Sequence, residues 1–248
     1  AISWGNAEFI AAEEMSRFRG YWWSPDSQSI AACRVDVSSI NVWHIADPAH
    51  PELPATEHRY PAAGTPNASI SLHIISVATA TATPVELSGN WEYLNTVSWN
   101  NAGLIAQTQT RNQKQIDIHS IDPGTGKAAI VFTDTDEAWV ELVPGVPALQ
   151  QDGILVTCAD RDGSRRLLVN GSAVTPTTMQ VRSVVSVSDS MPSWIASWTW
   201  SGNGLTGQTG NLSNTISSLA PGSSMVYTVV ATVKPDATGA SLTNTATV

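Results

Sequence analysis

The 248-residue sequence is poor in charge, in cysteine and in long apolar runs. Only 13% of its residues are charged, and 21 acidic residues outnumber 12 basic ones, which gives a net charge of −9. Nucleic acids are bound by basic faces, so this balance argues against a nucleic-acid partner. No apolar run approaches the roughly 18 residues that cross a membrane as a helix, so we expect no membrane span.

The sequence contains only two cysteines, Cys33 and Cys158, each within an apolar run. A disulfide framework would need more, so two buried free thiols are the favoured interpretation and one disulfide is the alternative. No Cys and His residues cluster at metal-binding spacing, and we expect no metal or other cofactor. The sequence shows no signal-peptide pattern and opens mid-pattern at Ala1. Its localisation stays open, with a secreted, periplasmic or surface location slightly favoured by the sparse charge.

Turn residues recur between short apolar segments along most of the chain. Residues 7–18 contain adequate helix formers and are followed by Gly20, so they predict one short helix. Beyond it, "SPDS", "NNAG" and two Asp-Gly dipeptides predict tight turns between strands. Units of this kind begin near residues 22, 98 and 147, a spacing typical of four-stranded modules in propellers or sandwiches. The fold class predicted is all-β.

The composition changes near residue 185. From residue 183 to the end, the only charged residues are Asp189, Lys234 and Asp236. The strings "SSMVYTVVATV" and "SLTNTATV" alternate apolar and polar residues, as half-buried strands do. Two domains are therefore expected, over residues 1–187 and 188–248.

Three short strings imitate ligand-binding motifs but are interpreted as turns. Residues 202–207 fit Gly-x-Gly-x-x-Gly without a following helix pattern. Residues 122–127 lack the first glycine of a phosphate-binding loop, and residues 160–163 lack the further acids of a calcium loop. Trp198 and Trp200 share one face of a predicted strand, where core packing is favoured over a carbohydrate platform.

Four strings in the first part of the chain occur in the order found in one family. They are "AEFIAAEEMSRFRGYWWSPD", "RYPAAGTPNA", "WVELVPGVP" and "ADRDGSRRLLVNG". Together they resemble the N-terminal β-propeller of bacterial dipeptidyl peptidase IV, in the prolyl oligopeptidase clan, over about residues 1–187. The resemblance implies a partial, open β-propeller with one short N-terminal helix. The family's serine peptidases remove Xaa-Pro or Xaa-Ala dipeptides from peptide N-termini. Their propeller covers the catalytic α/β-hydrolase domain and admits only short peptides to it.

The resemblance also implies a role for two adjacent acids, Glu13 and Glu14. They match a glutamate pair that binds the free α-ammonium group of the substrate. Two carboxylates make charge-assisted hydrogen bonds to an ammonium group and leave an acylated N-terminus without a partner. The expected partners are peptides with a free N-terminus and an α/β-hydrolase domain outside this sequence. The residues alone favour a simpler alternative, in which Glu13 and Arg17, spaced i,i+4, pair on a solvated helix.

The sequence contains no catalytic residues that the resemblance could assign. An α/β-hydrolase needs a Gly-x-Ser-x-Gly elbow followed by an acid and a histidine, and no such elbow occurs. His73 is interpreted as a strand residue, and His50 and His58 as solvated. We therefore expect a substrate-gating, amine-binding part of a serine exopeptidase that is inactive alone, and an active peptidase is disfavoured.

The later strings "VSDSMP", "WTWSGNG", "LAPGSSMVYTV" and "LTNTATV" are similar to a different family. They resemble Ig-like β-sandwich repeats of unknown function on bacterial surface and adhesin-like proteins. The resemblance covers residues 184–248, the later half of such a module, and implies an incomplete sandwich. The alternative function is therefore a chimeric secreted or cell-surface spacer that carries a relic propeller.

Overall fold

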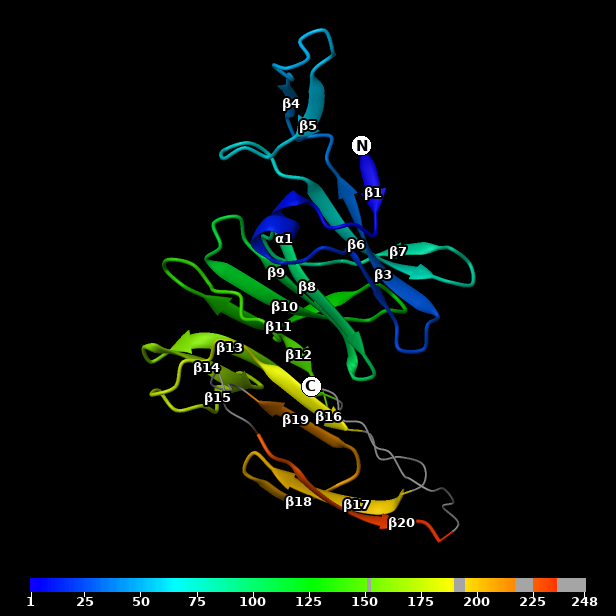
Figure 1. Ribbon diagram of the computed structural model, residues 1–248, viewed down its shortest axis with the longest axis vertical. Coiled ribbons are helices and arrows are strands. Elements are labelled where there is room, and N and C mark those ends of the chain that lie inside the picture. The colour runs from blue at the N-terminus through cyan, green and yellow to red at the C-terminus, as the bar shows by residue number, and fades with distance from the viewer. Residues whose placement is uncertain (151–152, 190–194, 217–224, 236–248) are drawn as a thin grey trace. The chain divides into compact units, whose positions relative to one another are not determined.

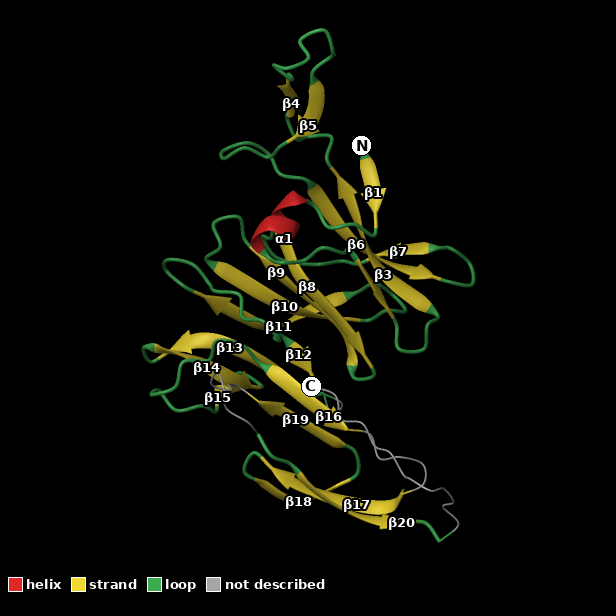
Figure 2. Cartoon of the chain, in the orientation of Figure 1, coloured by secondary structure: helices red, strands yellow, loops and turns green. Residues whose placement is uncertain are grey.

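The computed structural model describes residues 1–150, 153–189, 195–216 and 225–235. The chain divides into two compact units. The first comprises Ala1–Leu142 with Pro147–Val156, and the second comprises Val143–Val146 with Thr157–Val248. Within the described residues there is a single helix, α1 (Phe9–Glu14), and all other regular elements are strands (Figure 2). The prediction of an all-β fold with one short N-terminal helix is therefore confirmed.

The first sheet lies in the first unit and is centred on two long strands, β3 (Ser29–Asp36) and β6 (Ser69–Ser76). The strand order is β1 (Ile2–Trp4), β3, β6 and β7 (Ala82–Pro84), and β2 (Tyr21–Trp23) also pairs with β3 (Figure 1). All these pairings are antiparallel. Helix α1 occupies the connection between β1 and β2, so it is tied to the edge of this sheet at both ends.

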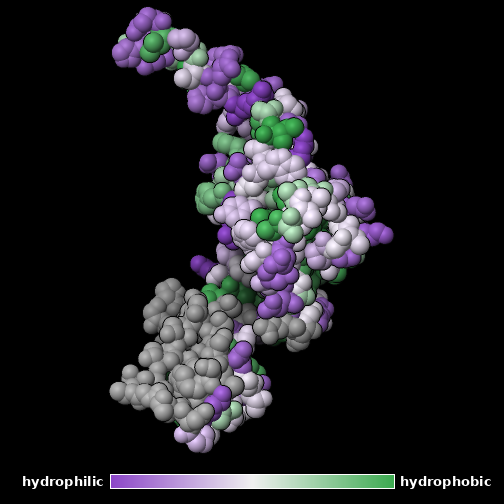
Figure 3. Space-filling model, turned by 90° about the vertical axis from the view of Figure 1, so that its right-hand side faces the viewer, coloured by the Kyte–Doolittle hydropathy of each residue, from purple (hydrophilic) through white to green (hydrophobic). Residues whose placement is uncertain are grey.

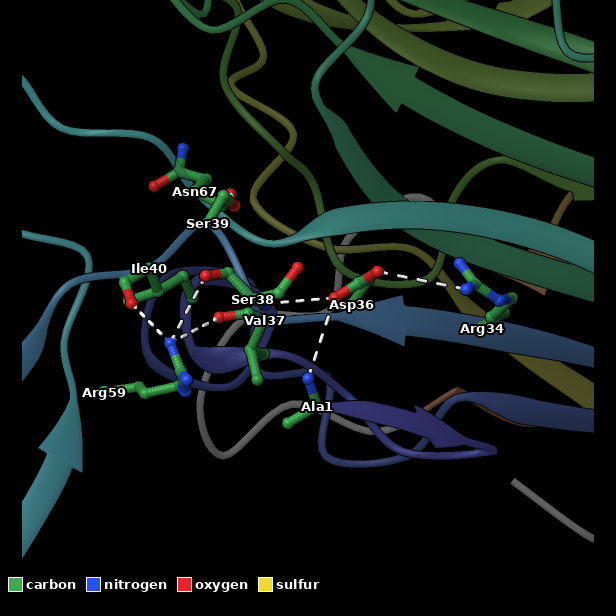
Figure 4. Close-up of polar contacts among 9 residues, drawn as sticks. All are labelled: Ala1, Arg34, Asp36, Val37, Ser38, Ser39, Ile40, Arg59 and Asn67. Atoms are coloured by element: carbon green, nitrogen blue, oxygen red, sulfur yellow. Dashed lines mark hydrogen bonds and ion pairs between the residues drawn. The ribbon is translucent and has the colours of Figure 1, made fainter.

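Between β3 and β6 the chain leaves the sheet as a two-stranded hairpin of β4 (Val42–Ile45) and β5 (Thr56–Arg59), whose residues are all exposed. The Arg59 guanidinium anchors its base by donating to three backbone carbonyls, the nearest being that of Ile40 at 2.7 Å (Figure 4). Asp36 fixes the same loop by accepting from the Ser38 N–H at 3.0 Å. Hydrophilic residues cover most of the hairpin's projecting end (Figure 3).

The second sheet, also in the first unit, is a meander of four antiparallel strands in the order β11, β10, β9, β8. The strands are β8 (Tyr93–Asn100), β9 (Gly103–Gln109), β10 (Gln115–Ile121) and β11 (Ala128–Thr135). The "NNAG" turn predicted between β8 and β9 is confirmed, with Asn100 Oδ1 accepting from the Ala102 N–H at 2.8 Å. Residues 122–127 form the turn between β10 and β11, as predicted. Asp122 closes this turn by accepting from the Gly124 N–H at 2.9 Å.

The main core of the first unit draws its buried side chains from the first two sheets and from Ile40 and Ala68 in the adjoining loops. It comprises Ala31, Cys33, Val35, Ile40, Ala68, Leu72, Ile74, Leu94, Val97, Leu104, Ala106 and Ile121. Burial of apolar surface stabilises the folded state by about 25 cal/mol for each Å² removed from water. This shared core gives β2, and with it the segment carrying α1, a rigid support because Trp22 packs against the same cluster.

The third sheet has the strand order β12, β13, β14, β15, and the division between the two units passes through β13. Its strands are β12 (Ala148–Leu149), β13 (Leu155–Arg161), β14 (Ser164–Val169) and β15 (Ser172–Ala173). Residues 160–163 form the predicted hairpin turn, with Asp162 and Gly163 at φ 54° and 78°, the left-handed pair that suits a right-twisted hairpin. The predicted Asp152-Gly153 turn lies partly outside the described residues.

The remaining strands form two small antiparallel sheets in the second unit. They are β16 (Val185–Asp189) with β19 (Leu212–Ile216), and β17 (Ile195–Gly202) between β18 (Leu205–Thr209) and β20 (Thr228–Val233). Trp198 and Trp200 are buried, which confirms the prediction of core packing. Residues 202–207 span the hairpin turn between β17 and β18, as predicted.

The alternation predicted for "SSMVYTVVATV" is confirmed over residues 225–230, where half-buried and exposed residues alternate. In β20, Val229 packs against the small Trp200 cluster, and Val230 is 68% exposed, as a period of two requires. Among the described strands it pairs only with β17, so its other edge has no described strand beside it. The string "SLTNTATV" lies outside the described residues. The domain boundary at residues 187–188 and the Ig-like sandwich stay predictions.

One histidine of the second sheet is completely buried. His119 lies on β10, its Nε2 is 3.0 Å from the Thr108 hydroxyl, and its Nδ1 has no hydrogen-bond partner in the described structure. Burial lowers the pKa of His119, and the nearby Asp117 carboxylate opposes this effect only in part. The native imidazole therefore stays neutral in a pH range where an unfolded one takes up a proton.

Acidification is therefore expected to destabilise the protein. An unfolded His119 has a pKa of about 6.5, so stability falls as the pH drops below that value and levels off below the native pKa. Urea midpoints measured between pH 7.5 and 5 should show this slope, and it should be shallower in His119→Gln. His58→Gln, on the exposed strand β5, is the matched control. An equal flattening in both variants would contradict the assignment to His119.

Candidate functional site

Helix α1 has only six residues and owes its start to one side chain. The Glu8 carboxylate caps it, with Oε2 accepting from the Ile10 N–H at 2.6 Å and Oε1 from the Ala11 N–H at 2.9 Å. The helix is shorter than the predicted residues 7–18. It ends because Met15 leaves helical geometry, at φ −116°, and Ser16 adopts a left-handed conformation, at φ 51°.

Glu13 and Glu14 occupy the last turn of α1, and both side chains are exposed. Neither carboxylate has a hydrogen bond or ion pair within the part of the chain that the structure describes. Acidic residues are unfavourable at a helix C-terminus, where the helix dipole is negative. The pair therefore does not stabilise the helix. Both carboxylates are exposed to a cationic ligand in solution.

The alternative pairing of Glu13 with Arg17 is wrong. Arg17 is only 7% exposed, and its Nη2 lies 3.8 Å from the Glu8 carboxylate. The i,i+4 spacing brings two side chains together only along a continuous helix, and the left-handed Ser16 interrupts it. Arg17 consequently turns inward, away from the acidic pair.

A cluster of three partly exposed aromatic rings lies beside α1. The Phe9 and Tyr60 ring centroids are 5.2 Å apart, and those of Tyr60 and Trp43 are 5.6 Å apart, both with edge-to-face geometry. Phe9 precedes Glu13 by four residues, so the two side chains share one face of the helix. The cluster connects α1 to the β4–β5 hairpin. The sequence does not predict this aromatic cluster, because its three residues are separated by loops whose path the sequence does not specify.

A serine and a histidine come together on β6 but do not form a catalytic triad. The Ser71 hydroxyl is 2.9 Å from His73 Nε2, while His73 Nδ1 has no partner among the described residues. A triad requires a carboxylate on that second nitrogen. Burial and the Arg34 charge lower the pKa of His73. The prediction that His73 is a strand residue is confirmed, and the predicted exposure of His50 and His58 is confirmed as well.

Both thiols are buried and free, which confirms the favoured interpretation of the cysteines. Burial raises the pKa of Cys33 to about 11 and that of Cys158 to about 11. A thiol reacts as the thiolate, so neither is a nucleophile near neutral pH. Over the described residues, no group of three or more His, Cys, Asp or Glu side chains could hold a metal ion. No described helix is long and apolar enough to cross a membrane.

The antiparallel sheets follow one another in sequence order, as the blades of a β-propeller do, and the class of fold is a partial, open β-propeller. The chain is similar to the crystal structure of Porphyromonas gingivalis dipeptidyl peptidase 4, with a TM-score of 0.64 at 20% identity. The similarity covers 74% of this chain and 28% of that one. This likeness supports the predicted fold class.

Two curated relatives extend the comparison to sequence. Inactive dipeptidyl peptidase 10 of Rattus norvegicus is 24% identical over 173 residues, which are 65% of this chain and 22% of the relative. Dipeptidyl peptidase 8 of Homo sapiens is 29% identical over 86 residues, 31% of this chain and 10% of the relative. The chain spans about a fifth of the length of inactive dipeptidyl peptidase 10 and about a tenth of that of dipeptidyl peptidase 8.

The dipeptidyl peptidase IV N-terminal region matches residues 1–195. The chain therefore belongs to the family of dipeptidyl peptidase IV N-terminal regions. The resemblance of about residues 1–187 to this family is therefore confirmed.

Proposed function

We propose that this chain is the substrate-gating part of a dipeptidyl peptidase IV-like serine exopeptidase, in which Glu13 and Glu14 bind the free α-ammonium group of a peptide. The observation that carries the proposal is the exposed acidic pair at the end of α1, with no partner inside the described structure. The proposed substrates are peptides that release Xaa-Pro or Xaa-Ala dipeptides.

The chemistry of an ammonium group suits two adjacent carboxylates. The group carries a full charge and three N–H donors, so it can donate to both acids at once. Acetylation removes the charge and two of the donors. A site of this kind measures distance from the peptide's first residue, which is the requirement for an exopeptidase.

The bond-breaking chemistry in this proposal belongs to an α/β-hydrolase domain outside these 248 residues. The present chain would hold the amine and restrict entry. The matched relatives include dipeptidyl peptidase 8 and, from two rodents, inactive dipeptidyl peptidase 10, so membership supports ancestry and not activity. Peptidase activity by this chain alone is not proposed.

A spacer role for the C-terminal part is a second candidate. It is supported by the two small antiparallel sheets β16–β19 and β17–β18–β20, and by the sparse charge after residue 183. In this alternative an incomplete Ig-like module joins the propeller to a surface or secreted assembly. Labelling of intact source cells with an impermeant reagent should reach the protein, and failure to label it would count against the spacer role.

Calorimetric titration with a peptide beginning Ala-Pro tests the amine site. An exposed ion pair is worth at most about 1 kcal/mol, so two carboxylates should favour the free peptide over its N-acetylated form by roughly tenfold in Kd. The two peptides differ only at the N-terminus, so contacts along the rest of the peptide are the same in both titrations. Equal affinity for both would overturn the proposed function.

A further inference from the structure

Helix α1 is too short to hold its own geometry. A six-residue helix forms few internal hydrogen bonds and lies far below the roughly 12–15 residues at which isolated helices become marginally stable. Only Ala11 among its residues is fully buried. The direction in which Glu13 and Glu14 point must therefore be set by residues outside the helix.

Glu8 fixes the start of the helix from a buried position. It is 6% exposed, and its two oxygens accept from the N–H groups of Ile10 and Ala11. Burial raises the pKa of Glu8, while these two hydrogen bonds and the Arg17 charge oppose the effect. A buried carboxylate with only backbone partners would be costly, so the nearby guanidinium is needed to compensate it.

Arg17 fixes the end of the helix, three residues beyond Glu14. Its backbone N–H donates to the Ala11 carbonyl at 3.0 Å. Its Nε donates to the Leu94 carbonyl on β8 at 3.2 Å, and its Nη1 to the Arg19 carbonyl at 3.0 Å. The guanidinium also lies over the Trp22 ring, 5.9 Å from its centroid. One side chain thus ties the segment after α1 to the second sheet and to β2.

The two buried side chains meet each other across the helix. Arg17 Nη2 lies 3.8 Å from Glu8 Oε1, so the ion pair joins the residue before α1 to the segment after it. We propose that Glu8 and Arg17 are positioning residues of the amine-binding site, which act by holding α1 so that both acids face outward. This inference rests on the proposed function of Glu13 and Glu14. Because both residues are almost fully buried, they act through the helix rather than by contact with a peptide.

The variants Arg17→Lys and Glu8→Gln separate the hydrogen-bonding geometry of the pair from its charge. Lysine keeps the charge but lacks the planar fork that reaches Glu8, Leu94 and Arg19 together. Glutamine keeps one acceptor for the helix cap but loses the charge. Arg19→Lys is the matched control, because the Arg19 side chain is exposed and only its carbonyl takes part.

Hydrogen exchange reports on the helix independently of any ligand. The N–H groups of Ala12 and Met15 donate to the Glu8 and Ala11 carbonyls. We expect both to exchange about tenfold faster in Arg17→Lys and Glu8→Gln, while the Cys33 amide in the core keeps its protection. The Kd of the Ala-Pro peptide should weaken about tenfold, towards that of its acetylated form, and the kcat of any attached hydrolase should be unaffected once peptide is saturating.

Each outcome of these measurements has a defined meaning. Unchanged exchange at Ala12 and Met15 in both variants would overturn the positioning role. If a variant unfolds, so that Cys33 also loses protection, Glu8→Asp decides, because it keeps the charge and the cap at shorter reach. In Glu8→Asp the exchange rate of the Met15 amide should rise more than that of the Ala12 amide. Wild-type protection of both amides would again overturn the positioning role. If the wild type does not distinguish free from acetylated peptide, the proposed function fails while the exchange data still judge the ion pair.

Discussion

The double variant Glu13→Gln/Glu14→Gln is expected to bind a free-amine peptide about tenfold more weakly than the wild type and to lose its preference over the acetylated peptide. Glutamine keeps the size and one acceptor oxygen of each side chain, so the loss isolates the two charges. Exposed ion pairs contribute about 0.2–1 kcal/mol each, and the two together give roughly the factor stated. Calorimetry at low ionic strength measures it, because salt screens such pairs.

A charge-matched control accompanies this variant. Glu52→Gln/Glu57→Gln removes the same number of charges from exposed glutamates of the β4–β5 hairpin region, whose carboxylates lie 3.4 Å from His50 Nδ1 and 3.8 Å from His44 Nδ1. The control should keep the preference for the free amine. If both double variants weaken binding equally, the effect belongs to the net charge of the protein, and Glu13 and Glu14 are ordinary helix surface.

Gly126→Ala is expected to destabilise the first unit by about 2–5 kcal/mol. Gly126 has φ +74°, and an added Cβ would overlap the Pro84 carbonyl oxygen at the end of β7. The left-handed conformation costs alanine about 1–2 kcal/mol, and the overlap adds about 1–3 kcal/mol. The Gly126 carbonyl also accepts from the Glu86 N–H at 2.8 Å, so the turn cannot move away freely.

Gly64→Ala separates the two causes. Gly64 has nearly the same conformation, at φ +80°, but no atom lies within 4 Å of the position that an added Cβ would take, so only the backbone cost of about 1–2 kcal/mol applies. Urea midpoints followed by tryptophan fluorescence compare the two variants. Equal midpoints would show that the close approach to Pro84 relaxes without cost.

Local chemistry explains what the sequence could predict. The turns at Asn100, Asp122 and Asp162 each depend on side chains or backbone angles within a few residues, so they are visible in the sequence. The burial of Trp198 and Trp200 follows from the period of two along a strand. The end of α1 was harder to place, because Ser16 takes a left-handed conformation that its residue type does not require.

In the candidate site, too, some features follow from local sequence and others from long-range contacts. Glu13 and Glu14 are adjacent in sequence and were found through the resemblance of their surroundings to a family. The burial of Arg17 depends on the Leu94 carbonyl, 77 residues away, and no spacing rule reaches that far. Phe9 meets Tyr60 and Trp43 only because the hairpin returns to α1. Long-range contacts of this kind come from packing, and local pattern does not encode them.

The two shielded thiols make the protein convenient for site-specific labelling. Burial raises the pKa of each native thiol to about 11, so little thiolate forms at pH 7.5, and burial also shields the sulfur from a maleimide. A cysteine introduced at the surface has a pKa of about 8.5 and is therefore ionised to a much larger extent. Phe18→Cys replaces a side chain that is 79% exposed, next to Arg17. A fluorophore there would report on peptide binding and on α1 in a chain that keeps both natural cysteines.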